Sequence, residues 1–376
     1  MRIETEIINN YHVKYRLEKI ASWDKILFLD IETTGFSAAN SYLYLIGCIY
    51  FKEGSFHVIQ WLAESYEEEK EILSAFFQFA ADFTHLAHYN GNNFDLPFMV
   101  QKCAQYGLPF SFAPFEGLDI YRRVTPYRSL LGLPNCKQRT VEQFLKIKRS
   151  DLYNGGDLIS IYHDYVAAPS IEGRYLLLMH NVSDLKGMLE ILPILAYHDL
   201  FNGPLKAKKV QANYYPDSNG YGHNMLYMKL RLPSALPAPL SFNYDHLFFK
   251  GDGEEGYLAV PIYEEELKYF YANYQDYYYL PTEDCALHKS IASYVDKEFR
   301  RQATAATCYS RKSAAFLPQW EILVEPFFKR DYADRLSFFE ITDDIKKNRL
   351  LFSEYAQHIL GIIKKGQAGN HPTKGQ

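Results

Sequence analysis

The stretch KILFLDIETTG, residues 25–35, decides the fold. Residues 25–31 form a short and nearly unbroken apolar run that is closed by the polar residues 33–35, which predicts a buried strand over 25–31 rather than a helix. Residues i and i+2 of a strand project from one face, so the side chains of Asp30 and Glu32 lie next to each other. Leaving both charges unpaired beside a core would cost on the order of several kcal/mol. Basic side chains or a divalent cation must neutralise them, unless the strand simply ends in solvent.

The residues that follow predict a mixed sheet covered by helices. The expected elements are strands over 42–51, 55–63 and 86–89 and helices over 66–82 and 95–106. Lys52-Glu53-Gly54 suits a hairpin turn between the first two strands. Hairpin strands followed by a helix, a strand and a helix are typical of an α/β layer fold.

Two further stretches place polar groups on predicted elements. The run from Asn90 to Asp95 leads from a strand into a helix and puts a carboxylate at the helix N-terminus, where it is favoured. His180 and Asp184 lie four residues apart on a helix expected over 174–198, and such residues share one face. By themselves, Asp95 fits a helix cap and the pair fits an exposed surface contact.

Together and in this order, the three stretches resemble the motifs of the DnaQ-like (DEDD) 3′→5′ exonucleases of the ribonuclease H-like superfamily. Within that group the chain is most similar to the YprB-like ribonuclease H-like domain proteins, through Asn181 after His180 and through Gly155-Gly156-Asp157. The resemblance covers residues 22–200 and implies an α/β fold, a ribonuclease H-like mixed sheet flanked by helices. It leaves a C-terminal α+β region of unknown fold.

The resemblance also implies a catalytic site. Its expected metal ligands are Asp30, Glu32, Asp95 and Asp184, and its expected contacts to the terminal nucleotide are Thr33, Thr34 and Asn90. Four oxygen donors suit Mg²⁺ or Mn²⁺. Two such ions are expected to serve an in-line displacement on phosphorus.

His180 departs from the pattern of the family. The histidine branch has its His five residues before the final Asp, whereas here a His occupies the four-residue spacing of the tyrosine branch. A histidine ordinarily titrates near pH ~6.5 and can accept a proton from water. We expect His180 to act as a general base or to position a water, because it shares a helix face with Asp184; the alternative is a neighbour of the site without a role.

The charge distribution bears on the substrate. The chain of 376 residues carries a net charge of -5, which argues against a nucleic-acid partner, yet residues 121–150 carry a net charge of +7. This segment lies between two motifs, so Arg122 and Arg123 are expected to contact a phosphate backbone. Tyr121 and Tyr127 offer stacking surfaces for unpaired bases. The predicted partner is single-stranded DNA or RNA; a merely solvated basic face is the alternative.

The second half has a different texture. Of the 32 tyrosines, 14 lie between residues 201 and 300. The expected organisation is an N-terminal extension over 1–21, a ribonuclease H-like exonuclease domain over 22–205, a tyrosine-rich α+β domain over 206–366 and a disordered tail over 367–376. In the tyrosine-rich part we expect strands over 225–232 and 257–262 and helices over 286–301 and 343–365.

Other classes of protein fit poorly. No apolar run approaches the roughly 20 residues of a membrane helix. The five cysteines show none of the spacings of a zinc or redox motif. A cytoplasmic protein without a membrane partner is expected.

The function that these patterns favour is a metal-dependent 3′→5′ exonuclease acting on the end of single-stranded DNA or RNA. The same fold also suits a nucleic-acid-binding or scaffold protein with weak catalysis, which the unusual histidine spacing and the unassigned second half support. A structure-specific endoribonuclease is a further alternative.

Overall fold

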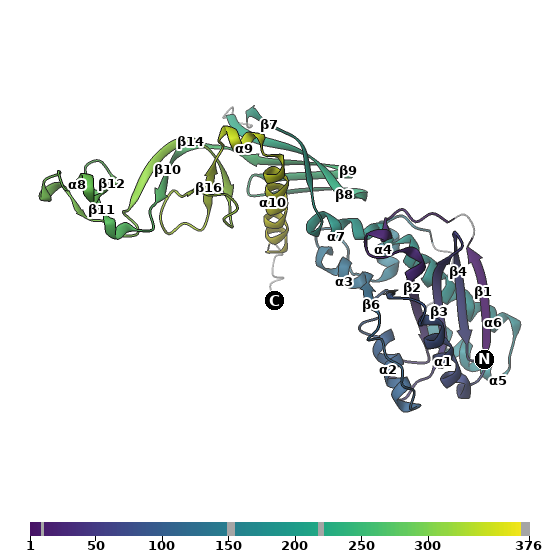
Figure 1. Cartoon of the computed structure of the whole chain (residues 1–376). Helices are drawn as coiled ribbons and strands as arrows, with labels where there is room; N and C mark the ends of the chain where they lie inside the picture. Colours follow the sequence, from purple (N-terminus) through teal and green to yellow (C-terminus); the bar gives the residue numbers. More distant parts are fainter. Residues whose placement is uncertain (9–10, 149–154, 217–221, 370–376) are drawn as a thin grey trace, which may run out of the picture. The chain divides into compact units, whose positions relative to one another are not determined.

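A computed structural model describes residues 1–8, 11–148, 155–216 and 222–369 (Figure 1). The chain divides into two compact units. The first unit comprises Met1–Asp199 with Ser234–Ala238, and the second comprises Leu200–Pro233 with Pro239–Gln376. Among the residues described, no helix is both long enough and apolar enough to cross a membrane.

The first unit is built on one mixed sheet with the strand order β1-β4-β3-β2-β5-β6. Its strands are β1 (Arg2–Ile8), β2 (Ile26–Thr33), β3 (Leu43–Lys52), β4 (Ser55–Leu62), β5 (His85–His88) and β6 (Glu116–Asp119). The pairs β1–β4, β4–β3 and β3–β2 are antiparallel, whereas β2, β5 and β6 are parallel. The carboxyl ends of the three parallel strands therefore meet at one edge of the sheet.

The strands predicted over 25–31, 42–51, 55–63 and 86–89 are confirmed. The hairpin turn is also confirmed, since Glu53 and Gly54 both have positive φ values, 52° and 81°, as a tight two-residue turn requires. The sequence did not reveal β1 or β6. Residues 1–21, expected as an extension, thus supply a strand at the edge of the sheet.

Helices cover both faces of this sheet. The helices over residues 69–202 are α1 (Glu69–Ala80), α2 (Asp95–Gln105), α3 (Ile120–Val124), α4 (Gln138–Phe144), α5 (Gly155–Ala167), α6 (Ile171–Glu190) and α7 (Leu195–Asn202). Short 3₁₀ turns are η1 (Leu17–Lys19), η2 (Trp23–Lys25), η3 (Tyr66–Glu68), η4 (Thr125–Tyr127) and η5 (Leu192–Ile194). The helices predicted over 66–82 and 95–106 correspond to η3 with α1 and to α2.

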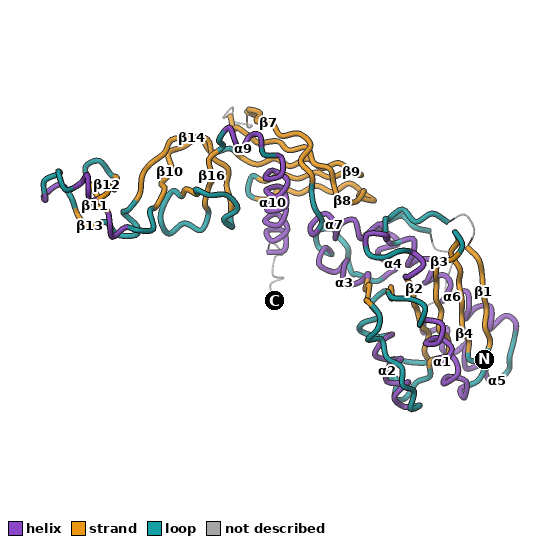
Figure 2. Tube along the Cα trace, in the orientation of Figure 1, coloured by secondary structure: helices purple, strands orange, loops and turns teal. Residues whose placement is uncertain are grey.

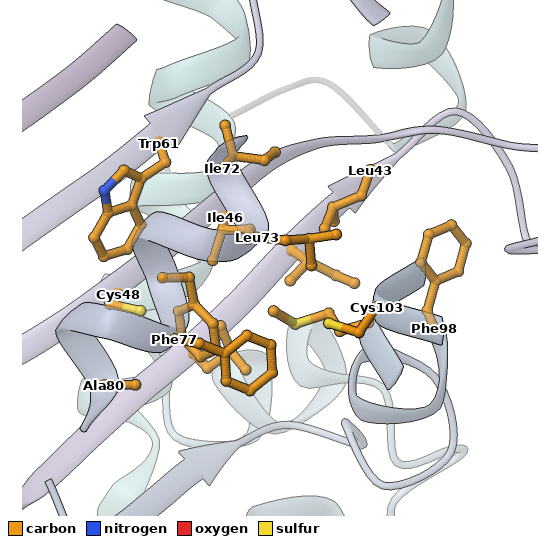
Figure 3. Close-up of a cluster of buried hydrophobic side chains, with 14 of the residues drawn as sticks. Leu43, Ile46, Cys48, Trp61, Ile72, Leu73, Phe77, Ala80, Phe98 and Cys103 are labelled. Atoms are coloured by element: carbon orange, nitrogen blue, oxygen red, sulfur yellow. The ribbon is translucent and has the colours of Figure 1, made fainter. Parts of the chain in front are cut away.

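The face under α1 and α2 is apolar. Side chains of β3 and β4 such as Ile46 and Trp61 interdigitate there with Ile72 and Phe77 of α1 and with Phe98 of α2 (Figure 3). The opposite face carries α6, which packs on β2 and β3, with α5 beside it. Because side chains alternate along β2, Leu29 and Ile31 enter the apolar cluster while Asp30 and Glu32 point to the α6 side.

The single helix predicted over 174–198 is wrong. The structure divides this segment into α6, η5 and α7, with the break at Leu192-Pro193-Ile194. Proline lacks the backbone N–H that an uninterrupted helix needs and its ring crowds the preceding turn, so the helix ends before Pro193.

The second unit is dominated by strands, as Figure 2 shows. Its first sheet has the order β7-β8-β9, with β7 (Lys206–Pro216), β8 (Gly222–Tyr244) and β9 (Leu247–Pro261). The next has the order β10-β14-β16-β15, with β10 (Tyr263–Phe270), β14 (Tyr309–Gln319), β15 (Phe327–Phe328) and β16 (Ser337–Glu340). The predicted strands 225–232 and 257–262 correspond to parts of β8 and β9.

The helix predicted over 286–301 is also wrong. This segment forms β12 (Cys285–His288), α8 (Lys289–Ala292), η7 (Lys297–Phe299) and β13 (Arg301–Gln302). Both strands pair with β11 (Tyr277–Leu280), which follows η6 (Tyr274–Asp276). Pairing with a tyrosine-rich strand outside the segment overrides its local helical pattern.

The C-terminal helix predicted over 343–365 is two helices. These are α9 (Asp343–Lys347) and α10 (Arg349–Gly369), which packs on β7 and β9. Asn348 separates them because its side-chain Oδ1 accepts a hydrogen bond from the Leu351 backbone N–H and so begins a new helix. Helix α10 continues beyond residue 365, where the predicted helix ends. Of the predicted tail, residues 367–369 belong to α10, and residues 370–376 lie outside the described part of the chain.

Candidate active site

Strand β2 positions the first two acids. Asp30 pairs with Gly47 and Glu32 with Leu45 across the β2–β3 ladder. Both carboxylates project toward α6. Glu32 is buried, while part of Asp30 remains accessible. The close pair that the sequence predicts on one strand face is therefore present.

Helix α6 brings the third motif to the same place. His180 Nε2 lies 3.3 Å from Asp184 Oδ2 and 3.9 Å from Glu32 Oε1. One ligand atom from each of these three residues lies within 4.8 Å of the other two, which is close enough for one metal ion. The imidazole thus faces the carboxylates and is itself buried.

Asp30 is also tied to α6. The Asn181 side-chain Nδ2 donates a hydrogen bond of 2.8 Å to Asp30 Oδ2. Burial holds the pKa of the Asp30 carboxyl well above its ordinary value, and the negative charges of Asp184, Glu32 and Asp95 raise it further; the Asn181 hydrogen bond lowers it. The charges that act on Asp30 have its own sign, so a cation at this point would relieve the repulsion.

Asp95 comes from the other covering helix. It is the first residue of α2 and is buried. Burial raises the pKa of its carboxyl to about 7, against the effect of hydrogen bonds from the Asp95 and Ile31 backbone, while the charge of Asp119 raises it further. The link to Ile31, which lies between Asp30 and Glu32, places the second motif beside the first.

Two residues that the sequence did not point out hold the second motif in place. Asp119, the last residue of β6, accepts a hydrogen bond at Oδ1 from the Asn90 N–H, and His88 accepts one at Nδ1 from the Gly91 N–H. Asn90 has a φ of 64°, a strained value that these bonds maintain. Within the described residues, Asp119 Oδ2 and His88 Nε2 are buried without a hydrogen-bond partner. Burial lowers the pKa of His88.

Asp119 was detectable in principle. It ends the short run Gly117-Leu118-Asp119, and a carboxylate at the end of a strand parallel to β2 must lie at the same sheet edge as the other acids. The strand has only four residues, two of them exposed, so its pattern is too weak to stand out in the sequence.

The residues expected to contact the substrate differ in their hydrogen bonds and in their exposure. Thr33 Oγ1 donates to the Gly35 carbonyl and Thr34 Oγ1 accepts from the Tyr42 N–H, so both hydroxyls shape the loop after β2. Asn90 Oδ1 accepts from Asn93 Nδ2. Arg122 has an exposed side chain whose Nε lies 3.8 Å from Asp119 Oδ2, next to the second motif.

Arg123 is not placed beside the acids by any contact in the described structure. It is partly buried, and its charge acts on the phenol of Tyr15, whose pKa it lowers against the stronger effect of burial. Of the two arginines, Arg122 is therefore the one at the sheet edge that carries the acids.

An exposed aromatic residue follows the first motif. Phe36 is 93% exposed, and its ring packs edge-on against Phe94, at a centroid distance of 6.1 Å, one residue before Asp95. Among the described residues of this unit, Phe36 is the most exposed large apolar side chain. The sequence alone does not single it out, because phenylalanine is common in this chain.

Comparison with known proteins identifies the fold of this region. The family RNase_H_2, described as RNase_H superfamily, matches residues 27–196. Together with the mixed sheet and its covering helices, this match confirms the predicted ribonuclease H-like fold for the first unit. No curated protein matches the sequence. The assignment to the DEDD, DnaQ-like and YprB-like groups stays a prediction.

Solved structures with partial similarity include a family B DNA polymerase from the archaeon Pyrobaculum calidifontis, with 12% identity and a TM-score of 0.36 over 67% of this chain. Escherichia coli exonuclease I bound to single-stranded DNA shows 13% identity and a TM-score of 0.27 over 56% of this chain. This chain spans 35% of the polymerase and 55% of the exonuclease. Likenesses of this extent do not define the chemistry of the chain.

Proposed function

We propose that the first unit is a metal-dependent 3′→5′ exonuclease that hydrolyses the terminal phosphodiester bond of single-stranded DNA or RNA. The observation that carries the proposal is the convergence of Glu32, His180 and Asp184 within 4.8 Å, beside Asp30. These residues come from a strand and a helix about 150 residues apart in the chain, and they bring together acids that repel one another.

The donor set fits divalent cations. Asp30, Glu32, Asp95 and Asp184 would hold Mg²⁺ or Mn²⁺, both of which prefer oxygen ligands. When bound, such ions lower the pKa of a water and stabilise negative charge on the leaving oxygen. Burial and neighbouring carboxylates raise the pKa values of Asp30 and Asp95, and a cation at the site would offset the repulsion between the charged groups.

The side chains of this unit have distinct roles in the proposal. His180 accepts the proton of the attacking water, and Asp184, whose Oδ2 lies 3.3 Å from His180 Nε2, would hold metal beside it. Arg122 contacts a backbone phosphate. Phe36 stacks on an unpaired base near the cleaved end.

The test uses 5′-labelled single-stranded DNA and RNA, with and without Mn²⁺. The wild type is expected to give a ladder of shortened products only with Mn²⁺, and Asp30→Asn is expected to reduce its rate by about 10³-fold or more, because it removes a metal ligand. The matched control is Asp164→Asn, which neutralises an exposed acid on α5.

Undiminished cleavage by folded Asp30→Asn would contradict the proposal. Binding of the labelled strand by the wild type without any cleavage would favour the nucleic-acid-binding or scaffold function instead. Internal cuts in structured RNA, in place of a ladder, would favour the endoribonuclease.

A further inference from the structure

A row of three residues crosses the sheet at the level of Asp30. The β2–β3 register pairs Asp30 with Gly47, and the β3–β4 register pairs Gly47 with Gln60. Directly opposed residues of antiparallel strands project to the same face. An acid, a glycine and an amide therefore stand side by side on the face that α6 covers.

The glycine of this row makes room for Asn181. A Cβ atom built on Gly47 would lie 1.8 Å from Asn181 Oδ1 and 2.7 Å from its Cγ, far inside contact distance. Asn181 has no exposed surface. Its side chain thus fills the space above Gly47, between the side chains of Asp30 and Gln60, and no larger residue at position 47 leaves it there.

Both ends of the Asn181 amide are hydrogen-bonded. Its Nδ2 donates to Asp30 Oδ2 at 2.8 Å, and its Oδ1 accepts from Gln60 Nε2, also at 2.8 Å. Gln60 Nε2 in turn donates to the Leu178 carbonyl of α6 at 3.0 Å. These hydrogen bonds fix the direction of the Asn181 amide. A reversed Asn181 would set two donors against each other at Gln60 and two acceptors at Asp30.

We propose that Asn181, oriented by Gln60 in the space left by Gly47, is a positioning residue that holds the Asp30 carboxylate in the orientation that binds metal. The inference rests on the proposed function and names a further part of the same site. With Oδ2 fixed by the amide, Asp30 cannot turn away from Glu32 and Asp184 when the site is empty. Groups that orient a ligand in this way typically contribute about 10–100-fold to metal affinity or activity.

The first experiment measures Mn²⁺ affinity by titration calorimetry on the full chain. Asn181→Ala and Gln60→Ala are expected to weaken Mn²⁺ binding, with the larger loss, about 10–100-fold, in Asn181→Ala. In cleavage assays kcat is expected to fall while KM for the oligonucleotide is retained, since neither residue contacts the oligonucleotide in the proposal. A role confined to packing would lower the unfolding midpoint and leave Mn²⁺ affinity unchanged.

The second experiment uses Gly47→Ala, which removes no polar group and acts by displacing Asn181. It is expected to weaken Mn²⁺ binding about as much as Asn181→Ala, and the double variant is expected to bind no more weakly than Asn181→Ala alone. With Asn181 removed, the nearest of these atoms to the new methyl group is Leu185 Cδ1, at 2.8 Å, the end of a flexible side chain. Gly117→Ala is the matched control, because a Cβ there meets nothing within 4 Å.

The outcomes separate the inference from the proposed function. Wild-type affinity for Mn²⁺ in folded Asn181→Ala overturns the positioning role and leaves the exonuclease intact. The positioning role is also overturned if the losses of Mn²⁺ affinity in Gly47→Ala and Asn181→Ala multiply in the double variant. A wild type that neither binds Mn²⁺ nor cleaves overturns both.

Discussion

Glu69 and Asp30 are both acidic side chains packed into the first unit, but their surroundings differ. Glu69, at the start of α1, has no exposed surface and accepts hydrogen bonds from the Leu43 N–H and the Tyr106 hydroxyl, at 2.6 Å each. Lys102 of α2 supplies the balancing charge at 3.1 Å. Asp30 instead has carboxylates as its charged neighbours.

The difference in charged neighbours distinguishes a structural contact, at Glu69, from a candidate functional site, at Asp30. The Glu69 group, which is Glu69 with its partners Leu43, Tyr106 and Lys102, joins α1, α2 and β3. Its charge is balanced by Lys102, so it needs no ligand. The acids around Asp30 repel one another, which lowers the stability of the apo protein and creates a demand for cations. A buried carboxylate by itself indicates neither role; the sign of the charges around it does.

The largest expected effect follows from breaking the Glu69 group. Glu69→Gln leaves the buried ammonium of Lys102 without its counter-charge, so the free energy of unfolding is expected to fall by about 3–5 kcal/mol. Urea denaturation of the metal-free protein measures it. The control Glu71→Gln, an exposed acid on the same helix, is expected to stay within about 0.5 kcal/mol of the wild type. Equal losses of unfolding free energy in Glu69→Gln and Glu71→Gln would show that the buried ion pair of Glu69 does not stabilise the fold as described.

The next effect concerns metal and the Asp30 group. Mn²⁺ at 100 times its Kd is expected to raise the free energy of unfolding by about 2.7 kcal/mol, because it binds the assembled acids and not the unfolded chain. Asp184→Asn is expected to abolish most of this gain. Glu71→Gln, which lies outside this group, should retain it in full. Thermal unfolding with and without Mn²⁺ provides the measurement, and an unchanged midpoint in the wild type would show that the acids do not form a metal site.

The sequence anticipated much of this arrangement. The apolar run ending in Asp30 and Glu32, and the i,i+4 spacing of His180 and Asp184, predicted residues that the fold does bring together. These predictions depend on local periodicity. The pairing of Gly47 with Asp30 depends on strand register, and the space that Asn181 fills depends on packing between a helix and a sheet. Neither can be read from spacing along the chain.

The failures in the second half have a related cause. Residues 286–301 show local helical character, but β12 and β13 gain more by pairing with the tyrosine-rich strand β11. The break at Pro193 is different, because proline is a local feature and its effect on the predicted helix could have been read directly.

The stability of the metal-free protein is also expected to depend on pH. The pKa of Asp95 is about 7 in the folded protein, above the value of 3.8 that an unperturbed aspartate has. Between these values the folded state binds more protons than the unfolded state, so this group makes the free energy of unfolding fall as pH rises, by up to about 1.4 kcal/mol per pH unit. Asp30, whose pKa is also raised, acts in the same direction.

The measurement compares the metal-free wild type with Asp95→Asn between pH 4.5 and 7 (about the window of the two values). The wild type is expected to lose stability more steeply than the variant as pH rises, and the difference should level off above pH ~7. Parallel curves would show that Asp95 is an ordinary carboxylate like those on the surface.

The smallest expected effect tests whether the acids around Asp30, unlike Glu69, lie next to a surface that binds substrate. Phe36 is almost fully exposed, so Phe36→Ala is expected to change the free energy of unfolding by less than about 0.5 kcal/mol. Base stacking on an aromatic ring contributes about 1–3 kcal/mol, so KM for single-stranded DNA is expected to rise at least about fivefold. Phe36→Tyr keeps the ring and should retain the wild-type KM. The control Phe299→Ala removes an exposed phenylalanine in the second unit. If both alanine variants keep the wild-type KM, the exposed ring beside the acids has no part in holding the strand.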